Sequence, residues 1–246
     1  MIELYQAAPC WGLPDLSPFS IKLHTYFRMT KLPYQVGSEL TLQDAPKGKI
    51  PFIRHNGKLI GDSNLIIEYF KKTLGIDPDE HLSKEEQAIS LAFRRLIEEN
   101  LYWVAIYSAY AMEENWQIYK TVMKKLLKPL TESTDDEFFE GLRAQILKEC
   151  WGQGMSRHSE PEIFEIGQRD LRALADFLGE KPFFMGAKPT ILDATAYGFL
   201  ARIISDSLPT PVKEYALRLS NIQLFCDRLR AEFYTEEETK LWQVEL

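Results

Sequence analysis

The chain has 246 residues, a formal net charge of −7 and 45% hydrophobic residues, a balance typical of an ordinary globular protein with one or two cores. Its acidic charge argues against nucleic acid as a main partner, because phosphate binding favours a basic surface. No apolar run approaches the roughly 18 residues of a membrane-spanning helix, and residues 1–10 lack the basic start and apolar stretch of a signal peptide.

The cysteines and histidines show no metal-binding pattern. Cys10, Cys150 and Cys226 are odd in number and far apart, which fits neither a disulfide framework nor a zinc site. The histidines also share no spacing, so no metal is expected. They are His24, His55, His81 and His158. We therefore expect a reducing compartment, the cytoplasm.

The first part of the chain alternates strand and helix patterns. Residues 2–6 alternate apolar and polar side chains, which predicts a half-buried strand. After a loop rich in proline and glycine, Ser17-Pro18 has the form of a helix start, with serine as N-cap and proline at the first helical position. A second strand is predicted over residues 32–36.

Residues 49–70 predict a hairpin that runs into a capped helix. Asn56-Gly57 separates two apolar runs and suits a type I′ turn, in which both central residues need a positive φ. Asp62 or Ser63 can then cap a helix with an apolar face. The resulting order, β-α-β-loop-β-β-α, is that of a thioredoxin-like α/β domain. We place this domain at residues 1–75.

The rest of the chain is predicted to be helical. Residues 76–84 are a polar linker, and residues 85–246 form an all-α domain with apolar residues at helical spacing. Thr190 and Asp193 form a capping-box signal before an apolar helix, and we assign both to structure rather than to catalysis.

Three motifs follow one another along the chain. They are Ser17-Pro18-Phe19-Ser20, the segment from Lys49-Ile50-Pro51 to Asp62-Ser63, and the segment Met185 to Asp193. Together they resemble the glutathione transferases, whose fold is a thioredoxin-like α/β domain followed by an all-α domain. The stretches LSPFSIKLHTYFRM and KGKIPFI look closest to the failed-axon-connections and metaxin-like branch. The resemblance implies glutathione as co-substrate, a small apolar electrophile as second substrate, and a homodimer.

The resemblance also implies a glutathione-binding set. The Ile50–Pro51 bond is expected to be cis, with the Ile50 backbone paired to the cysteinyl residue of glutathione. Ser63 would take the γ-glutamyl carboxylate, since helix N-termini attract anions, and Asp62 would face the γ-glutamyl ammonium. Lys49 would pair with the glycyl carboxylate. The plainer alternatives are a bare helix cap at Asp62 and Ser63, and a solvated surface lysine at Lys49.

Ser17 is the catalytic candidate, as a donor to the glutathione thiolate and not as a base. A thiol has a pKa of about 8.5, and lowering it by two units takes roughly 2.7 kcal/mol. A hydrogen bond to a charged group contributes about 1.5–3 kcal/mol, so one hydroxyl and a helix N-terminus suffice. The plainer alternative is that Ser17 only caps its helix. Because Ser20 replaces the second cysteine of a C-x-x-C pair, dithiol chemistry at this motif is excluded.

Other candidates are weaker. Cys10 could form a mixed disulfide with glutathione, or it could be a small buried residue, and Tyr5 fits strand packing better than a role as thiolate donor. The resemblance also implies a pocket for an apolar co-substrate that is lined by aromatic side chains, unless these only pack between helices. They are Trp11, Trp103, Tyr107 and Tyr110.

Three functional hypotheses follow. The first is a glutathione transferase in which Ser17 ionises the thiol of bound glutathione. The second is a binding or docking protein that keeps the fold without useful catalysis. The resemblance to the failed-axon-connections and metaxin-like branch suggests this, and so does Asp62, a position at which many relatives have Glu or Gln. The third is glutathione-dependent thiol–disulfide exchange through Cys10.

Overall fold

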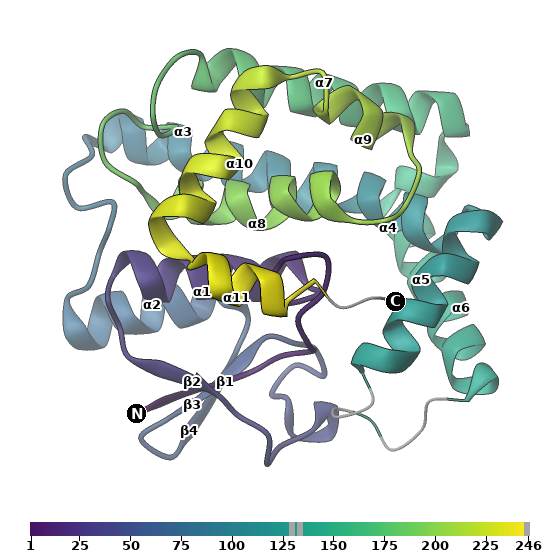
Figure 1. Cartoon of the computed structure of the whole chain (residues 1–246), viewed down its shortest axis with the longest axis horizontal. Helices are drawn as coiled ribbons and strands as arrows, with labels where there is room; N and C mark the ends of the chain where they lie inside the picture. Colours follow the sequence, from purple (N-terminus) through teal and green to yellow (C-terminus); the bar gives the residue numbers. More distant parts are fainter. Residues whose placement is uncertain (128–130, 132–134, 244–246) are drawn as a thin grey trace.

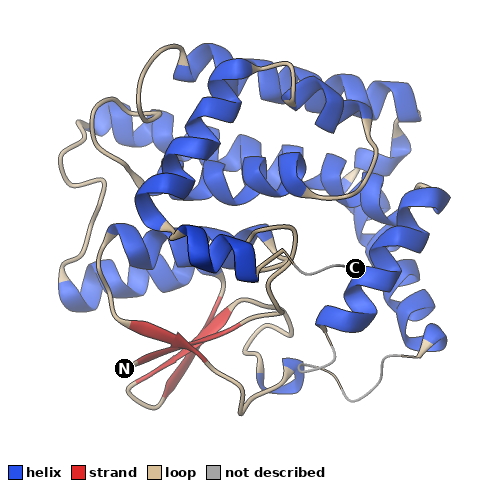
Figure 2. Ribbon diagram, viewed as in Figure 1, coloured by secondary structure: helices blue, strands red, loops and turns tan. Residues whose placement is uncertain are grey.

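The computed structural model describes residues 1–127, 131 and 135–243, and it has a small sheet in the first half of the chain and helices in the second (Figures 1 and 2). The strands are β1 (Ile2–Tyr5), β2 (Tyr34–Val36), β3 (Phe52–His55) and β4 (Lys58–Gly61). Their order is β2-β1-β3-β4, with β1 and β2 parallel and the other pairs antiparallel. The mixed sheet and the helices that follow it confirm the predicted fold class.

The sheet is covered on its two faces in different ways. Helices α1 (Pro18–Met29) and α2 (Ser63–Leu74) lie between the sheet and the helical half (Figure 1). Their apolar side chains meet Ile2, Leu4 and Ile53 of the strands in one buried cluster. The opposite face is covered by the loop that contains a short 3₁₀ helix, η1 (Leu42–Asp44).

The hairpin and the cap after it have the predicted form. His55 pairs with Lys58, and the two residues between them, Asn56 and Gly57, have φ values of 51° and 76°. This is the left-handed region that a type I′ turn requires. Asp62 then caps α2, because its carboxylate accepts hydrogen bonds from the backbone N–H groups of the second and third helical residues.

The helical half begins with a long rod made of α3 (Lys84–Arg95), the π-helical segment η2 (Leu96–Leu101) and α4 (Tyr102–Tyr110). The following elements are α5 (Glu113–Leu126), α6 (Asp136–Gln153), η3 (Met155–Arg157), α7 (Glu160–Leu178), α8 (Ile191–Ser205), α9 (Pro211–Ala216), α10 (Ser220–Phe233) and α11 (Glu236–Leu241). A π-helical turn inside an α-helix changes the phase of the residues after it.

Helix α8 is the central element, and it packs directly against α1 of the sheet-bearing half. Its start is fixed by the predicted capping box, in which Thr190 Oγ1 donates to Asp193 at 2.6 Å. The Asp193 carboxylate also accepts from the Phe184 backbone at 2.7 Å. Burial raises the pKa of Asp193 to about 6, which fits a structural carboxyl group.

Helix α11 runs back across α1 (Figure 1). Arg28 of α1 forms a two-pronged ion pair with Glu238 of α11, at 2.6 and 2.9 Å. Beyond the helix, the Trp242 carbonyl accepts a hydrogen bond of 3.0 Å from the Gly12 backbone. The C-terminal segment therefore holds the loop that leads into α1.

Two further features concern only the residues that the structure describes. None of their helices is both long enough and apolar enough to cross a bilayer. No group of three or more His, Cys, Asp and Glu side chains among them is arranged to hold a metal ion.

Candidate functional site

Ser17 is the residue just before α1, and its side chain is partly exposed. Its backbone has extended angles, φ −85° and ψ 126°, and its side chain makes no capping hydrogen bond within the described chain. Its backbone N–H donates instead to the Asp15 carboxylate at 2.7 Å. The hydroxyl is therefore not occupied by capping, which removes the competition between a cap and a thiolate donor.

The loop that carries Ser17 is anchored on both sides. Gln6, just after β1, donates to the Pro14 carbonyl at 3.0 Å. From the helical half, Arg202 Nε donates to the Leu16 carbonyl at 3.1 Å. These bonds fix the backbone on either side of Asp15, so the position of Ser17 depends on both halves of the chain.

Asp15 is a fully buried carboxyl group next to the candidate serine. Burial raises its pKa to about 7, and the hydrogen bond from the Ser17 N–H opposes that shift. Its Oδ2 has no hydrogen-bond partner within the described residues. Sequence reasoning missed Asp15, because a polar residue in a loop normally indicates solvent exposure.

The strand register places the predicted glutathione-binding segments at one end of the sheet, where β1 ends at Tyr5. Phe52 pairs with Tyr5 at the end of β1 and with Gly61 at the end of β4. The Ile50–Pro51 bond, which is cis in the structure, comes directly before Phe52. Asp62 and Ser63 come directly after Gly61, so both segments lie at the end of the sheet where β1 ends.

Ser63 is the first residue of α2, and it is 3% exposed. Its Oγ accepts a hydrogen bond of 3.3 Å from Nζ of Lys22, a residue of α1. Asp62 is exposed and uses one carboxylate oxygen for capping, at 2.9 and 3.1 Å from the backbone nitrogens of Asn64 and Leu65. The contact between Lys22 and Ser63 ties α1 to the N-terminus of α2.

Lys49 lies at the surface before the cis bond. Its ammonium group is 3.1 Å from the Glu149 carboxylate of α6, and the lysine side chain is 68% exposed. An exposed ion pair of this kind adds little stability, about 0–1 kcal/mol. Lys49 is thus close to the predicted region but already has a partner.

A small cavity of about 60 Å³ lies between the N-terminus of α1 and the helical half. Leu16 and Pro18, which flank Ser17, form one wall, and Tyr102 and Ile106 of α4 form another. The complete lining is Leu16, Pro18, Tyr102, Ala105, Ile106, Ala109, Tyr119, Phe199, Arg202, Ile203, Asp206 and Leu208. Its mainly apolar walls could hold a small apolar molecule.

Four aromatic residues were predicted to line a co-substrate pocket, and none of them is among the residues that line this cavity; three of them are on α4. Tyr110 is buried and stacks on Trp116 at 5.5 Å, and Tyr107 meets the edge of Phe164. Trp103 packs edge-on against Tyr102. Trp11 lies near the cavity, because the guanidinium of Arg202 is 4.2 Å above its ring. The face of α4 that lines the cavity carries Tyr102, Ala105, Ile106 and Ala109, which the sequence did not single out.

The other thiolate candidates are buried. Cys10 is 0% exposed, and burial raises the pKa of its thiol to about 12. This is the opposite of the lowered pKa that a reactive cysteine needs. Tyr5 is also buried and stacks on Phe52 at 4.8 Å, in agreement with strand packing.

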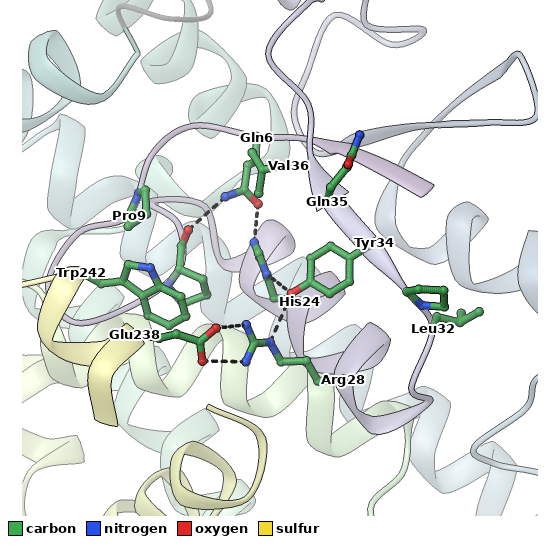
Figure 3. Close-up of a pocket in the computed structure, with 12 residues that line it drawn as sticks. Gln6, Pro9, His24, Arg28, Leu32, Tyr34, Gln35, Val36, Glu238 and Trp242 are labelled. Atoms are coloured by element: carbon green, nitrogen blue, oxygen red, sulfur yellow. Dashed lines mark hydrogen bonds and ion pairs between the residues drawn. The ribbon is translucent and has the colours of Figure 1, made fainter. Parts of the chain in front are cut away.

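A larger cavity of about 440 Å³ lies between β2, α1 and α11 (Figure 3). Along its wall, His24 contacts Gln6 at 2.5 Å and the Tyr34 hydroxyl at 2.6 Å. Arg28 joins Tyr34 to Glu238. Burial lowers the pKa of His24 to about 3, so the ring is neutral at physiological pH. This network ties α11 to α1, and Ser17 and Ser63 are not among the residues that line the cavity.

The chain is similar to known proteins over most of its length. The models of the glutathione S-transferase N-terminal and C-terminal domains match residues 18–116 and 167–229. The isoprene-epoxide–glutathione S-transferase of Rhodococcus sp. strain AD45 is 36% identical over 95% of this chain and 99% of its own length. Failed axon connections of Drosophila melanogaster is 30% identical over 87% of the chain, and metaxin-1 of Homo sapiens is 27% identical over 95%. The chain spans about half the length of these last two, 53% and 51%.

Solved structures show the same fold. Glutathione transferase GSTFuA3 of Phanerochaete chrysosporium matches with a TM-score of 0.63 and 16% identity, over 96% of this chain and 98% of that chain. A glutathione S-transferase of Methylobacterium radiotolerans, in complex with glutathione sulfonate, matches with a TM-score of 0.59 and 14% identity, over 100% and 96%. At these identities the likeness concerns the fold alone.

Proposed function

Because the chain belongs to the glutathione S-transferase family, we propose that it is a catalytically active member that transfers glutathione to a small apolar electrophile. The observation that carries the proposal is the Ser17 hydroxyl, which precedes α1 without a capping role in the described chain. It would donate a hydrogen bond to the sulfur of bound glutathione and favour the thiolate. A fixed donor at the position of developing charge needs no reorganisation during the reaction.

Glutathione would lie across the end of the sheet at which β1 ends. The backbone of Ile50 would pair with the cysteinyl residue, and the N-terminus of α2 with Ser63 would hold the γ-glutamyl carboxylate. Pro51 is buried, so the backbone beside it has a fixed position. Asp62 and Lys49 are weaker members of this proposed set, since one caps α2 and the other pairs with Glu149.

We propose a small epoxide as the electrophile. The Rhodococcus relative carries isoprene epoxide in its name, and the cavity beside Pro18 has a volume of about 60 Å³, which suits only a small apolar molecule. The thiolate sulfur would form a bond to one epoxide carbon while the C–O bond to that carbon breaks. The released alkoxide would then take a proton from solvent to give a hydroxyl group.

A second candidate is a glutathione-binding or docking protein without useful catalysis. It is favoured by the similarity to Failed axon connections and metaxin-1. It is also favoured because the Asp62 carboxylate already caps α2 and the Lys49 ammonium group already pairs with Glu149. Exchange chemistry through Cys10 is disfavoured by the burial and the raised pKa of its thiol. The homodimer and the cytoplasmic location stay predictions.

The deciding experiment is a calorimetric titration with glutathione, followed by ultraviolet detection of the bound thiolate at pH 7. Ser17→Ala should keep binding but lose the thiolate signal. Turnover of a small epoxide should fall about 10- to 100-fold, as expected for one lost hydrogen bond to a charged group. Ser90→Ala is the matched control, because Ser90 is a buried serine of α3 whose hydroxyl has no partner in the described chain.

Each outcome has a clear reading. No binding at millimolar glutathione would reject the transferase. Binding without a thiolate at pH 7 would favour the docking protein. Unchanged turnover in Ser17→Ala would reject the role of Ser17.

A further inference from the structure

Lys22 is a charged side chain in the buried interior, 0% exposed, in the second turn of α1. Its ammonium group has three N–H donors, and the structure gives each one an acceptor. These are Glu98 Oε1 at 2.6 Å, Asn64 Oδ1 at 2.8 Å and Ser63 Oγ at 3.3 Å. A buried ion is tolerated only when it is paired and fully hydrogen-bonded, and Lys22 meets both conditions.

Glu98 supplies the opposite charge from the π-helical segment η2, and its side chain is 2% exposed. Its Oε2 accepts from the Asn64 amide at 2.9 Å, which orients that amide with its oxygen toward Lys22. Burial lowers the pKa of the Lys22 ammonium group, whereas Lys22 lowers the pKa of Glu98 despite the burial of that carboxyl group. The contact of 2.6 Å and the two further acceptors of Lys22 favour the charged form of the pair.

The contact with Lys22 determines what the Ser63 hydroxyl can do. An ammonium group can only donate, so the Ser63 oxygen is the acceptor in this pair. The Ser63 proton must then point toward a different acceptor, and no acceptor for it is present in the described part of the chain. Asp62 meanwhile engages the N–H groups of Asn64 and Leu65, so the cap leaves the Ser63 N–H available.

We propose that Lys22 is a positioning residue for the γ-glutamyl end of glutathione, and that it makes the site selective for peptides with a free α-carboxylate there. It fixes the Ser63 hydroxyl as a donor and places a buried positive charge directly behind it. In the Lys22–Glu98 pair it is the ammonium group that contacts Ser63, so a carboxylate bound at Ser63 would meet the positive end of the pair. Glu98 offsets part of the attraction, but the low dielectric of the interior makes the remaining attraction stronger than in water. This inference rests on the proposed glutathione site.

An ion pair that served only to join the two halves of the chain would not make binding depend on the α-carboxylate. The test therefore compares ligands as well as variants. The ligands are glutathione, an analogue with γ-aminobutyrate in place of the γ-glutamyl residue, and an analogue with a glutaryl group there. The second lacks the α-carboxylate and keeps an amine, whereas the third lacks the ammonium and keeps a carboxylate.

The main variant is Lys22→Met with Glu98→Leu, which replaces both charges by apolar groups. Removing both partners together avoids a buried unpaired charge, because Arg95, the other partner of Glu98 at 3.5 Å, has a side chain that is 50% exposed and stays solvated. Such replacements are often neutral for stability. The second variant is Lys22→Gln with Glu98→Gln, which keeps polar groups in case the first does not fold. The control is Arg28→Met with Glu238→Leu, because that ion pair also joins α1 to the helical half, away from Ser63.

The wild type should bind glutathione at least about tenfold more tightly than the aminobutyryl analogue, as expected for a charged hydrogen bond. That ratio should fall toward one in both Lys22 variants and stay unchanged in the control. The preference over the glutaryl analogue should be the same in all proteins. A ratio that is equally large in the Lys22 variants, or absent in the wild type, would overturn the role of Lys22. If the wild type bound no glutathione at all, the proposed function itself would fail.

Discussion

Gly198 of α8 lies directly against the carbonyl oxygen of Pro18, the first residue of α1. A β-carbon at Gly198 would be 2.5 Å from that oxygen and 3.0 Å from the backbone nitrogen of Lys22. Both contacts are with backbone atoms, which cannot rotate away. Helices α1 and α8 therefore cross in close contact next to Ser17, and the contact is possible only because residue 198 has no side chain.

Gly198→Ala should destabilise the protein by about 1–3 kcal/mol, as overpacking of a core does. It should also weaken glutathione binding, because α1 must move away from α8 and carry Ser17 and Lys22 with it. Thermal unfolding and calorimetric titration measure the two effects.

The control is Gly141→Ala in α6, where an added β-carbon would meet nothing within 4 Å. That exchange should stabilise the helix by about 0.5–1 kcal/mol, because alanine favours helix more than glycine does. If Gly198→Ala and Gly141→Ala changed the stability equally, α1 and α8 would have room for a β-carbon at residue 198, and the close contact would be refuted.

Asp15→Asn should change how stability depends on pH. The folded pKa of Asp15, about 7, lies above its ordinary value of 3.8, so the folded protein holds this proton more tightly than the unfolded chain does. The wild type therefore loses stability as the pH rises from 4 to 7, and the loss is complete above 7. The asparagine variant does not titrate there.

The measurement is the difference in unfolding free energy between Asp15→Asn and the wild type in denaturant titrations at pH 4, 5.5, 7 and 8. The difference should move in favour of the variant by at least about 1 kcal/mol between pH 4 and 7, then stay constant. Other raised carboxyl groups, such as Asp170 and Asp193, cancel because both proteins contain them. A constant difference over the whole range would contradict the buried proton.

Ala105→Leu should fill the cavity beside Pro18. The cavity of about 60 Å³ has room for the three added carbons, so the fold should tolerate them. The KM for a small epoxide should rise several-fold while the affinity for glutathione stays the same, since no predicted glutathione residue lines the cavity.

Tyr107→Leu is the comparison, because the family resemblance predicts Tyr107 in the co-substrate pocket, whereas its ring packs against Phe164. Steady-state kinetics with varied epoxide concentration measure the KM of both variants. If Tyr107→Leu raised the KM more than Ala105→Leu, the co-substrate would bind near Tyr107 and not in the cavity beside Pro18.

Glu238→Gln should loosen α11. The Arg28 guanidinium lowers the pKa of Glu238 to about 2, from an ordinary value of 4.5, so the ion pair contributes stability above pH 4.5 that is lost as the pH falls toward 2. The glutamate side chain is 33% exposed, and solvent screening limits the loss at pH 7 to about 0.5–1 kcal/mol.

The control is Glu236→Gln, since the Glu236 side chain is 93% exposed and pairs with Lys240 of the same helix. Thermal unfolding at pH 7 and pH 3 should show a gap between the two variants that narrows at the lower pH. An equal effect of both substitutions would mean that the Arg28 contact does not hold α11.

Local signals in the sequence were sufficient for much of the fold. Asn56-Gly57 predicts the hairpin because few residues tolerate two successive positive φ angles, and the structure confirms that turn. The spacing of Thr190 and Asp193 predicts the capping box of α8, which is likewise confirmed. Both features depend on residues within a few positions of each other, so no knowledge of the tertiary structure is needed.

The surroundings of the candidate site could not be predicted in this way. Lys22 has the sequence signature of a surface lysine between two apolar residues, and its partner Glu98 lies 76 positions away. The cavity beside α4 is also lined by Pro18 of α1 and by Phe199 and Arg202 of α8, so no spacing along α4 alone indicates which of its sides faces the cavity. Ser17 could be named as a candidate from sequence. That its hydroxyl makes no capping hydrogen bond depends on the conformation of the loop before it, which the sequence does not show.

The sharing of core residues between the two halves has a consequence for how the chain unfolds. Leu13 and Ile21 belong to the buried cluster of the helical half, while Ile191 and Ala194 of α8 belong to the cluster under the sheet. Each half thus buries part of its apolar surface against the other. The protein should therefore unfold in one cooperative step, and either half expressed by itself should fail to reach a native state.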